Sequence, residues 1–509
     1  MVYYIKRTYA MSTPFPNISA FPVLAELSED FPKSRIYLVG GAVRDFLLDK
    51  KVTDLDIVIQ GVAGTNLEEF LATRGRVVFA GKHFGVWKFH EIGKPKEEVY
   101  DIALPRTEFS LHRHGAYRDF SVQTDPNLPI EEDLKRRDFT INAMAYDLKN
   151  EELIDPNNGQ DDLKNRIIRT VGAPEERFHE DYSRLLRAMR FSLQLDFALE
   201  QETRDVTRSM MVNVNNEADG RRVLPYEVIA EEFLKSFAAH PAAALGLWDE
   251  LGALAELVPE LLRMKNCMQP EHYHSEGDVW MHTRLALEQL SGGEFQKEFP
   301  NEKPDLELIM ATLFHDIGKP YTITTPEADG SDRIRFNNHD QIGANMTKTI
   351  LERMRIGSPA DINIKTDHIV WLVRYHMIGV HGDPDAMRPV TVEKYFFNQY
   401  QPSRNLLKLI YADSMATLNA GGNPITDVYE KLRGRIGEIK RITGSHGNRL
   451  VKPLLSGKDV MEVLSITEGP TIGIILNDVR QKQLSGELTS AEDARSFIMS
   501  HAKDYERDN

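Results

Sequence analysis

The pattern of apolar and polar positions changes once along the chain. From Arg35 to about Thr170, short apolar runs alternate with glycine-containing turns, which is typical of buried strands. This pattern predicts five strands, at residues 36–40, 55–60, 76–80, 86–90 and 99–104. After Glu175 the apolar residues follow a helical period, which in residues 181–197 places on one side Leu185, Leu186, Met189 and Leu193. We therefore expect an α/β region followed by helical modules.

Size and composition fit a soluble protein of several domains. The chain has 509 residues, which at roughly 100–200 residues per domain suggests about three or four units. No apolar run reaches about 18 residues, so we expect no membrane span. Cys267 is the only cysteine, which excludes an intramolecular disulfide and favours a reducing, cytoplasmic location.

The formal net charge of −15 argues against a surface that binds nucleic acid indiscriminately. A local basic track is still compatible with an acidic chain. The candidate track consists of Lys431, Arg433, Arg435, Lys440, Arg441, Arg449 and Lys452, opposed by Glu430 and Glu438. The alternative interpretation is a solvated charged helix.

A glycine pair, Gly40 and Gly41, joins the first predicted strand to a helix. Glycines let backbone N–H groups approach a phosphate closely, and a helix N-terminus adds a favourable partial positive charge. Arg44 follows three residues later and can donate two hydrogen bonds to a triphosphate. The turn alone is weak evidence, because most glycine pairs only make tight turns.

Two acids stand at the start of the next predicted strand, at Asp54 and Asp56. Residues two apart in a strand point to the same face, so both carboxylates can hold Mg²⁺ ions of a two-metal site. Apolar neighbours make an uncompensated burial of both charges costly, which disfavours the alternative of two exposed acids. Asp101, on a later predicted strand, is the candidate third carboxylate.

Two further polar pairs have helical spacing. Asp138 and Asn142 are four residues apart, so on a helix they share a face suited to ribose hydroxyls. Asp181 and Arg184 are three apart, and together they can accept from a base amino group and donate to ring acceptors. A surface ladder of ion pairs is the alternative for this second pair.

These motifs, in this order from Ile36 to Phe191, resemble the class II tRNA nucleotidyltransferase and bacterial poly(A) polymerase family of the polymerase β superfamily. The matching segments are GGAVRD with DLD, KRRDFTINAMA from Lys135, DPNNG from Asp155, and EDYSRLLRAMRF from Glu180. The resemblance implies a polymerase β-like α/β head with Mg²⁺ on Asp54 and Asp56. It also implies nucleotide contacts from Gly40, Gly41, Arg44, Arg137, Asp138, Asn142, Asp181 and Arg184, with Arg187 and Arg190 facing the triphosphate.

A second set of metal-ligating residues lies downstream, mostly within helical patterns. The set contains His282, His315, Asp316, His339, His376 and Asp413. Imidazole and carboxylate ligands suit Mn²⁺, Ni²⁺ or Zn²⁺ better than Mg²⁺. The order of the ligands resembles the HD-domain phosphohydrolases, in which the two extra histidines serve a second metal. This resemblance implies hydrolysis of phosphate esters, to which Lys319 could contribute by binding phosphate or only by packing.

Together the patterns predict a multidomain chain with an α/β nucleotidyltransferase head, an all-α neck, an HD-domain body and a helical tail. The expected divisions are an N-terminal extension at 1–34, the head at 35–173, the neck at 174–265, the HD domain at 266–425, and the tail, with possible tRNA contact, at 426–509.

The expected function is CCA addition to tRNA from CTP and ATP, with Mg²⁺ in the head and Ni²⁺ or Mn²⁺ in the HD domain. Three alternatives stay open: a poly(A) polymerase or A-adding enzyme, an HD phosphohydrolase whose head only binds RNA, and a helical RNA-binding scaffold.

Overall fold

The computed structural model describes residues 15–52, 55–80, 86–95, 99–110, 120–218, 220–444 and 450–505. Internal contacts divide the chain into two compact units, described separately below. Unit 1 comprises Met1–Ala239 with Gly246–Leu257, and unit 2 comprises His240–Leu245 with Val258–Asn509. The finer division into five segments stays a prediction.

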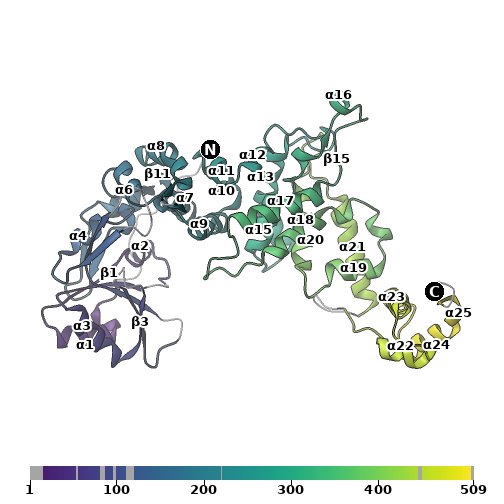
Figure 1. Cartoon of the computed structure of the whole chain (residues 1–509), viewed down its shortest axis with the longest axis horizontal. Helices are drawn as coiled ribbons and strands as arrows, with labels where there is room; N and C mark the ends of the chain where they lie inside the picture. Colours follow the sequence, from purple (N-terminus) through teal and green to yellow (C-terminus); the bar gives the residue numbers. More distant parts are fainter. Residues whose placement is uncertain are drawn as a thin grey trace. The chain divides into compact units, whose positions relative to one another are not determined.

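The main sheet of unit 1 lies in the head, and seven strands of the described residues form it in the order β3-β4-β5-β2-β1-β8-β9 (Figure 1). Only β2 and β5 run parallel, and the other neighbours are antiparallel. The strands are β1 (Arg35–Val39), β2 (Leu55–Gln60), β3 (Gly75–Ala80), β4 (Val86–Glu91), β5 (Tyr100–Ala103), β8 (Ala145–Asp147) and β9 (Glu152–Ile154). The five predicted strands are therefore confirmed. The two added strands have three residues each, too few to give a pattern.

Short helices cover this sheet and bury their apolar faces on it. In α3 (Gly64–Ala72), Leu67, Phe70 and Leu71 are buried, and the helix packs on β3. A small core joins Tyr37 and Val58 to Leu134. The other elements of the head are η1 (Ile18–Ala20), α1 (Pro22–Asp30), α2 (Gly41–Leu47), the hairpin β6 (Arg106–Ser110) with β7 (Phe120–Thr124), α4 (Ile130–Lys135), η2 (Thr140–Asn142) and α5 (Gly159–Asn165).

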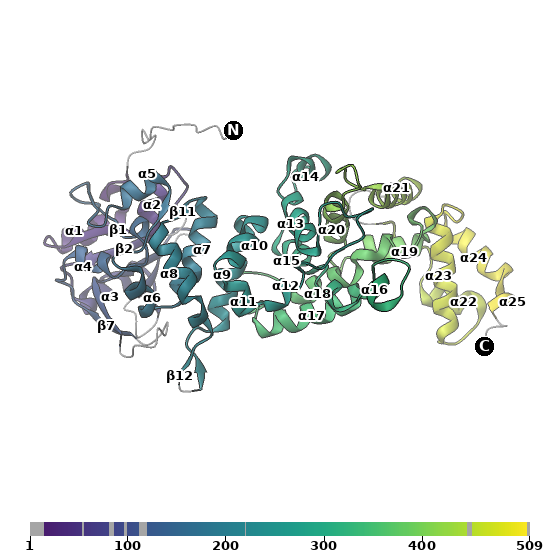
Figure 2. The same cartoon turned by 90° about the horizontal axis from the view of Figure 1, so that it is seen from above.

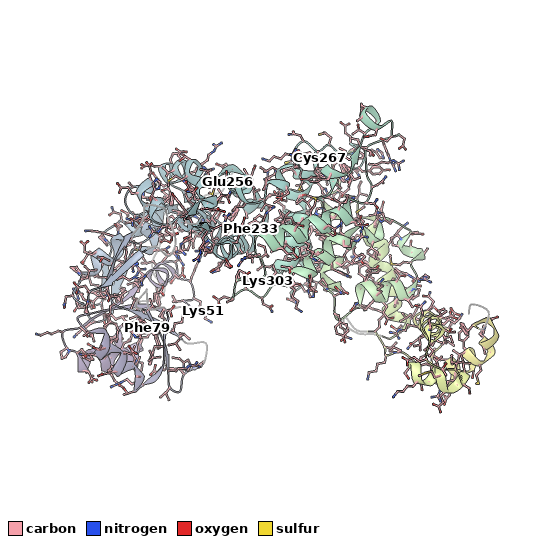
Figure 3. All side chains as sticks on the ribbon, in the orientation of Figure 1. Lys51, Phe79, Phe233, Glu256, Cys267 and Lys303 are labelled. Atoms are coloured by element: carbon pink, nitrogen blue, oxygen red, sulfur yellow. The ribbon has the colours of Figure 1, made fainter. Side chains whose placement is uncertain are left out.

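Helices make up most of the remainder of unit 1. The predicted apolar side of α7 (Ser183–Leu195) is buried at all four of its positions. In α9 (Tyr226–Ala239), the buried ring of Phe233 (labelled in Figure 3) packs edge-on against Trp248. The two ring centroids are 5.0 Å apart. The other elements are β10 (Ile167–Ile168), α6 (Pro174–Glu180), β11 (Ala198–Leu199), α8 (Gln201–Met210), η3 (Met211–Asn215), β12 (Glu217–Ala218), β13 (Arg221–Arg222) and α11 (Ala253–Leu257), while α10 (Pro241–Glu250) belongs partly to each unit.

Unit 2 is built almost entirely from helices (Figure 2). Its centre is α15 (Leu306–Phe314), whose residues from Leu308 onward are all buried and which packs against α13, α18 and α20. The other elements up to residue 442 are α12 (Pro259–Leu262), α13 (Val279–Gln289), α14 (Gly293–Glu298), η4 (Lys319–Tyr321), β14 (Ile323–Thr324), α16 (Pro326–Asp329), β15 (Arg335–Phe336), α17 (His339–Arg353), α18 (Thr366–Tyr375), η5 (His376–Gly379), η6 (Pro384–Ala386), α19 (Pro389–Phe396), α20 (Ser403–Ala416) and α21 (Asp427–Ile442).

The C-terminal helices have a hydrophobic core of their own, which includes Val460, Ile475 and Ile498. Capping boxes begin two of these helices, at Ser456 and Ser490, and satisfy backbone donors of their first turns. The helices are α22 (Gly457–Leu464), α23 (Pro470–Leu484), α24 (Ala491–Ser500) and α25 (Ala502–Tyr505). Among the described residues, no helix combines the length and the apolar character that crossing a membrane requires.

The candidate basic track lies on α21 and just beyond it, and acids neutralise part of its charge. Lys431 Nζ is 3.7 Å from Asp383, and Arg433 pairs with Glu298 at 2.7 Å. Arg435 pairs with Glu438 one turn away. Arg449 lies outside the described residues. The segment of the track from Lys431 to Arg435 therefore has less net positive charge than its three cations alone indicate.

Candidate active sites

The turn after β1 requires a glycine at its first position. Gly40 has a φ of +66°, a backbone conformation that side chains with a Cβ rarely adopt. A Cβ at this position would lie 2.7 Å from Arg137 Nη1 and 3.6 Å from Asp56 Oδ2. The bare backbone of Gly40 therefore lets these two side chains lie against the turn, with Gly41 opening α2 directly behind it.

Strand pairing brings two acids together in the head. Asp56 on β2 is the register partner of Asp101 on the parallel strand β5. Paired residues of neighbouring strands point to the same face, and both acids line one cavity. Lys88 of β4 lies 3.2 Å from Asp101 Oδ1. Carboxylate oxygens are the ligands that Mg²⁺ prefers, so this pair fits a Mg²⁺ ion. Asp54 lies outside the described residues and stays a prediction.

The residues expected to bind ribose meet, although no common helix carries them. Asn142 Nδ2 donates to Asp138 Oδ1 at 3.2 Å, and Arg44 Nη1 donates to Asn142 Oδ1 at 2.7 Å. The expected helix is wrong because Phe139 takes an extended backbone that bridges to Thr170, so only η2 follows it. A side-chain hydrogen bond, rather than helical spacing, therefore joins this pair.

Arg187 holds Asp138 with two hydrogen bonds, from Nε at 2.9 Å and Nη2 at 2.6 Å. Burial raises the pKa of Asp138, but the charge of Arg187 outweighs it and keeps the pKa well below its usual range. Arg190 lies further along α7, where Glu232 of α9 accepts from its Nε at 2.6 Å. Arg187 lines the cavity with Asp138, whereas Arg190 is not among the lining residues.

The pair expected to read the base also departs from one helix. Asp181 has an extended backbone between α6 and α7, and its carboxylate accepts from Ser183 N at 2.8 Å. Arg184 lies inside α7, pairs with Glu180 at 2.5 Å and donates to the carbonyl of Arg136 at 3.2 Å. Asp181 and Arg184 nevertheless lie in one place, because both side chains line the cavity of about 390 Å³ that Asp56 also lines.

Asp133, which sequence reasoning missed, pairs with two arginines that line this cavity. Its fully buried carboxylate accepts from Arg136 Nη2 at 2.9 Å and from Arg137 Nη2 at 3.2 Å. Burial raises the pKa of Asp133, but Arg136 and Arg137 outweigh it and lower the pKa. The signal that could have revealed it is its spacing, three and four residues before two arginines at the end of a helix.

Unit 2 gathers four buried histidines around one carboxylate. Three of them bond Nδ1 to the carbonyl three residues earlier: His315 to Thr312, His339 to Phe336 and His376 to Val373, at 2.7–2.8 Å. The fourth, His282, bonds Nδ1 to Glu276 at 2.9 Å. These bonds occupy Nδ1 in every ring and leave Nε2 for the centre of the cluster.

Asp316 divides the cluster into two halves. Its Oδ2 lies 3.3 Å from His315 Nε2 and 3.7 Å from His282 Nε2. Its Oδ1 lies 3.4 Å from His339 Nε2 and 3.7 Å from His376 Nε2. Within each half, the two Nε2 atoms are 3.3–3.4 Å apart. This geometry gives each half two nitrogen donors and one oxygen of the same carboxylate.

Asp413 of α20 adds a further oxygen to the first half, 2.9 Å from His282 Nε2. In the part of the chain that the structure describes, two of the three groups of side chains close enough to hold a metal are His282 with His315 and Asp413, and Asp316 with His339 and His376. The third, His274 with Glu276 and His282, adjoins the first. All six predicted ligands therefore meet. Imidazole nitrogens with few carboxylates fit divalent transition metals better than Mg²⁺.

The charges of the cluster influence one another strongly. Burial lowers the pKa of His282, but hydrogen bonds to Asp413 and Glu276 outweigh it and raise the pKa to about 9. In the other half, burial dominates and lowers the pKa of His339 to about 4 despite Asp316. Lys319 Nζ contacts Asp316 Oδ2 at 2.7 Å and Gln269 Oε1 at 2.8 Å, so it lies beside the cluster and has partners of its own.

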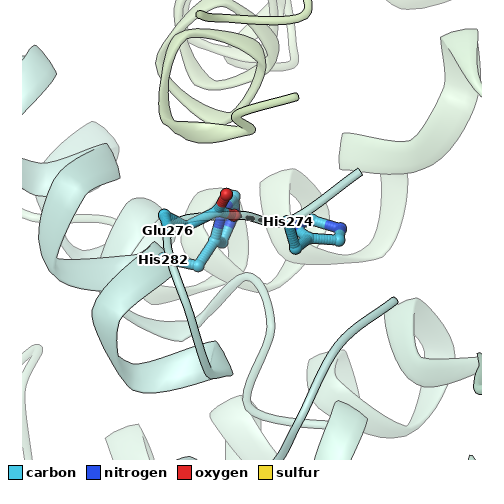
Figure 4. A group of neighbouring side chains, drawn as sticks. All are labelled: His274, Glu276 and His282. Carbon is cyan, nitrogen blue, oxygen red and sulfur yellow. Dashed lines mark hydrogen bonds and ion pairs between the residues drawn. The ribbon is translucent and has the colours of Figure 1, made fainter. Parts of the chain in front are cut away.

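Two residues that sequence reasoning missed, Glu276 and His274, lie beside His282 (Figure 4). Glu276 accepts from Nδ1 of both His282 and His274, at 2.9 and 2.6 Å. Burial raises the pKa of Glu276, but these two hydrogen bonds outweigh it and lower the pKa to about 2. The sequence held a usable signal, because a histidine and a glutamate stand eight and six residues before the first predicted ligand, His282.

Two family models match the chain in the regions just described. The model described as "Poly A polymerase head domain" matches residues 36–169, which contain Asp56, Asp101 and Asp138 of the head cavity. The model described as "HD domain" matches residues 278–414, which contain all six ligands of the histidine cluster. The head and the cluster thus correspond to two separate, known domains.

Relatives with both domains cover most of the chain. The "A-adding tRNA nucleotidyltransferase" of Deinococcus radiodurans is 30% identical over 474 residues, 92% of this chain and 95% of its own. The "Multifunctional CCA protein" of an Azoarcus species is 34% identical over 362 residues, 71% of this chain and 77% of its own. A crystal structure of the Bacillus stearothermophilus CCA-adding enzyme with CTP has the same fold, with a TM-score of 0.60 at 22% identity, over 97% of this chain and all of that one.

These likenesses agree with the geometry in both units. The head provides a nucleotidyltransferase cavity, and the second unit provides an HD cluster able to hold metal. The chain therefore belongs to the class II CCA-adding enzyme and poly(A) polymerase family, and an HD domain follows its head.

Proposed function

We propose that the head adds CMP and AMP, from CTP and ATP, to the 3′ end of tRNA, and that the HD domain hydrolyses phosphate esters. The observation that carries the first half is one cavity that unites two kinds of group. Asp56 and Asp101 provide oxygen donors for metal, and Asp181 with Arg184 provides hydrogen bonds for a base.

In this reaction the terminal 3′ oxygen of the RNA forms a bond to the α-phosphorus of the nucleotide, and the bond to pyrophosphate breaks. Mg²⁺ ions held by Asp56, by Asp54 as the sequence predicts and by Asp101 supply charge neutralisation for this transfer. The arginines near the cavity add fixed positive charge for the triphosphate, namely Arg44, Arg137 and Arg187. Arg190 is a weaker candidate for this role because Glu232 already engages it.

The base is chosen by a side-chain pair in place of a template. Cytosine and adenine both present an exocyclic amino group beside a ring nitrogen. The carboxylate of Asp181 can accept a hydrogen bond from the amino group, and Arg184 can donate one to the ring nitrogen. Guanine and uracil carry a carbonyl oxygen in place of that amino group and would face the carboxylate with repulsion. The pair therefore supports use of both CTP and ATP and exclusion of GTP and UTP.

A second candidate is addition of AMP alone. The observation that favours it is the Deinococcus radiodurans relative, an A-adding enzyme that aligns over 92% of this chain. The multifunctional CCA proteins, with 34–36% identity over shorter stretches, favour the full CCA activity. Both candidates use the same cavity and differ only in whether CTP is accepted.

For the HD domain, we propose two divalent ions such as Mn²⁺ or Ni²⁺ between the four imidazoles and the carboxylates of Asp316 and Asp413. Such ions supply Lewis-acid activation for hydrolysis of a phosphate ester. Lys319 lies 2.7 Å from Asp316, so its ammonium can also neutralise a phosphate that enters beside the cluster.

The experiment that decides the head's activity offers single nucleotides to three tRNA substrates, which end before CCA, after C and after CC. The proposal predicts CMP addition to the first two with CTP alone, and AMP addition to the third with ATP alone. Incorporation of AMP without any incorporation of CMP would assign the chain to A-only addition instead. Asp205→Asn, at an exposed acid of α8, is a control that should leave every reaction unchanged.

A further inference from the structure

The two halves of the HD cluster differ in what holds their histidines in place. Three rings bond Nδ1 to a neutral backbone carbonyl of the preceding turn. His282 alone among these four rings bonds Nδ1 to a carboxylate, that of Glu276. This carboxylate has no exposed surface, so water does not screen the contact.

Glu276 also connects the helices that carry two members of the first half, His282 and Asp413. It stands before α13, which carries His282, and its Oε2 accepts from Leu418 N at 2.9 Å, just after α20, which carries Asp413. Ser275 strengthens this link, because its N and Oγ donate to the carbonyls of Leu418 and Asn419 at 3.0 and 2.6 Å. One buried side chain thus fixes both the ring of His282 and the segment that follows Asp413.

His274 completes the arrangement from the outer side. Its Nδ1 lies 2.6 Å from the same Oε1 of Glu276, and its ring stands edge-on to His282, with centroids 5.3 Å apart (Figure 4). Its side chain is 16% exposed, whereas Glu276 and His282 are fully buried. His274 therefore holds Glu276 against His282 without reaching the centre of the cluster.

We propose that Glu276, oriented by His274, is a positioning residue that makes the His282–His315–Asp413 half the tighter of two unequal metal sites. A carboxylate on the far nitrogen of a ligating imidazole fixes its tautomer and orientation and makes it a stronger donor. This half also has a carboxylate of its own, Asp413, whereas the half of His339 and His376 has only Asp316. The two sites therefore fill in order, this half first.

The inference rests on the proposed binding of metal by the HD domain, and Co²⁺ titration of the full chain tests both. After removal of metal by a chelator, the chain is titrated with Co²⁺ under excess Mg²⁺, and the visible absorption of bound Co²⁺ is followed. The unsubstituted chain is expected to bind two equivalents in two steps of different affinity.

Glu276→Gln keeps the shape of the side chain and removes its charge. It should weaken the tighter step about 10–100-fold and leave the weaker step within about twofold. The matched control is Glu307→Gln, which alters a similar pair, Glu307 Oε2 with His368 Nδ1 at 2.7 Å, away from the cluster. This control should change neither step.

His274 provides an independent test of the orienting role. Asparagine at this position can donate to Glu276 as the ring does, so His274→Asn should preserve the tighter step that His274→Ala weakens. Both variants leave Glu276 in place, which keeps this test valid even if Glu276→Gln fails to fold.

Absence of Co²⁺ uptake by the unsubstituted chain would overturn the proposed metal site and this inference with it. Uptake in two equal steps, or equal weakening of both steps in Glu276→Gln, would overturn only the inference.

Discussion

The head and the HD domain differ in the donor atoms that their candidate metal sites present and in what positions these atoms. In the head, strand register places the carboxylates of Asp56 and Asp101 side by side, and oxygen donors predominate. In the HD domain, four imidazoles from different segments present Nε2 around one carboxylate, Asp316. A sheet thus sets donor spacing through its register, whereas the helical domain sets it through hydrogen bonds on the far nitrogen of each ring.

This difference predicts different metals in the two centres, because oxygen ligands favour Mg²⁺ and imidazole favours transition metals. The arginines of the head also differ in purpose from the cations of the HD domain. Arg136, Arg137 and Arg187 gather around a cavity for a polyanion, whereas Lys319 is the cation paired with Asp316 in the described part of the cluster.

Metal removal should give the largest effect. It tests directly whether the head and the HD domain prefer different metals. A chelator is expected to abolish both tRNA extension and phosphate ester hydrolysis. Mg²⁺ alone should then restore extension, and hydrolysis should return only with Mn²⁺ or Ni²⁺. Both rates are measured on the same preparation, with labelled tRNA and a chromogenic phosphodiester. Equal recovery of both reactions with Mg²⁺ alone would show that the two centres do not differ in metal preference.

Gly40→Ala should lower extension strongly and leave hydrolysis unchanged. Its Cβ would meet Arg137 Nη1 and displace it from the cavity, and displacement by about 1 Å can cost about a hundredfold in rate. The matched control is Gly93→Ala, at a φ of +86° with nothing within 4 Å of the added Cβ. The control also places alanine at a positive φ, which strains its backbone, but without the collision. Similar extension rates in both variants would refute the argument from Gly40.

A smaller effect is expected in the acid stability of the head. The pKa of Asp138 is lower in the folded chain than in the unfolded chain, so the unfolded state binds the proton first as pH falls. Its hydrogen bonds with Arg187 should stabilise the head by roughly 2 kcal/mol relative to Asp138→Asn at neutral pH. This advantage is fully present above the unfolded pKa of about 3.9 and is lost as pH falls below it.

Urea titrations that follow hydrogen-exchange protection of β1 measure this stability in both variants. The difference between them should be constant from neutral pH down to about pH 5 and shrink at lower pH. A difference that instead grows as pH falls would contradict the assignment of the ion pair.

Five strands of the head and the residues of the HD cluster could be predicted from the sequence, because both depend on recognisable sequence patterns. Apolar runs predicted β1 to β5, and the order of histidines and aspartates predicted the HD cluster that the structure assembles. Asp138 and Asn142 lie together as predicted, but the predicted helix is wrong. Phe139 is extended, and a side-chain hydrogen bond joins the pair.

The supporting residues escaped prediction for another reason. Glu276 owes its position to Leu418, which lies 142 residues away in the chain, and to the burial of its carboxylate. No local pattern reports such a contact. Arg190 likewise shares a motif with Arg187, yet its guanidinium donates a hydrogen bond to Glu232 of α9. Tertiary packing therefore decided which members of a motif face the cavity.

Separate centres for the two reactions are the central claim, and paired substitutions test it most directly. Asp56→Asn removes a proposed metal ligand of the head, and Asp413→Asn removes a proposed ligand of the HD cluster. Extension of tRNA lacking its 3′ end and hydrolysis of a phosphodiester are measured for both variants. The structure predicts that Asp56→Asn lowers extension by at least about a hundredfold and spares hydrolysis, and that Asp413→Asn does the reverse. Extension that survives Asp56→Asn within about tenfold of the unsubstituted rate would contradict the assignment of the head.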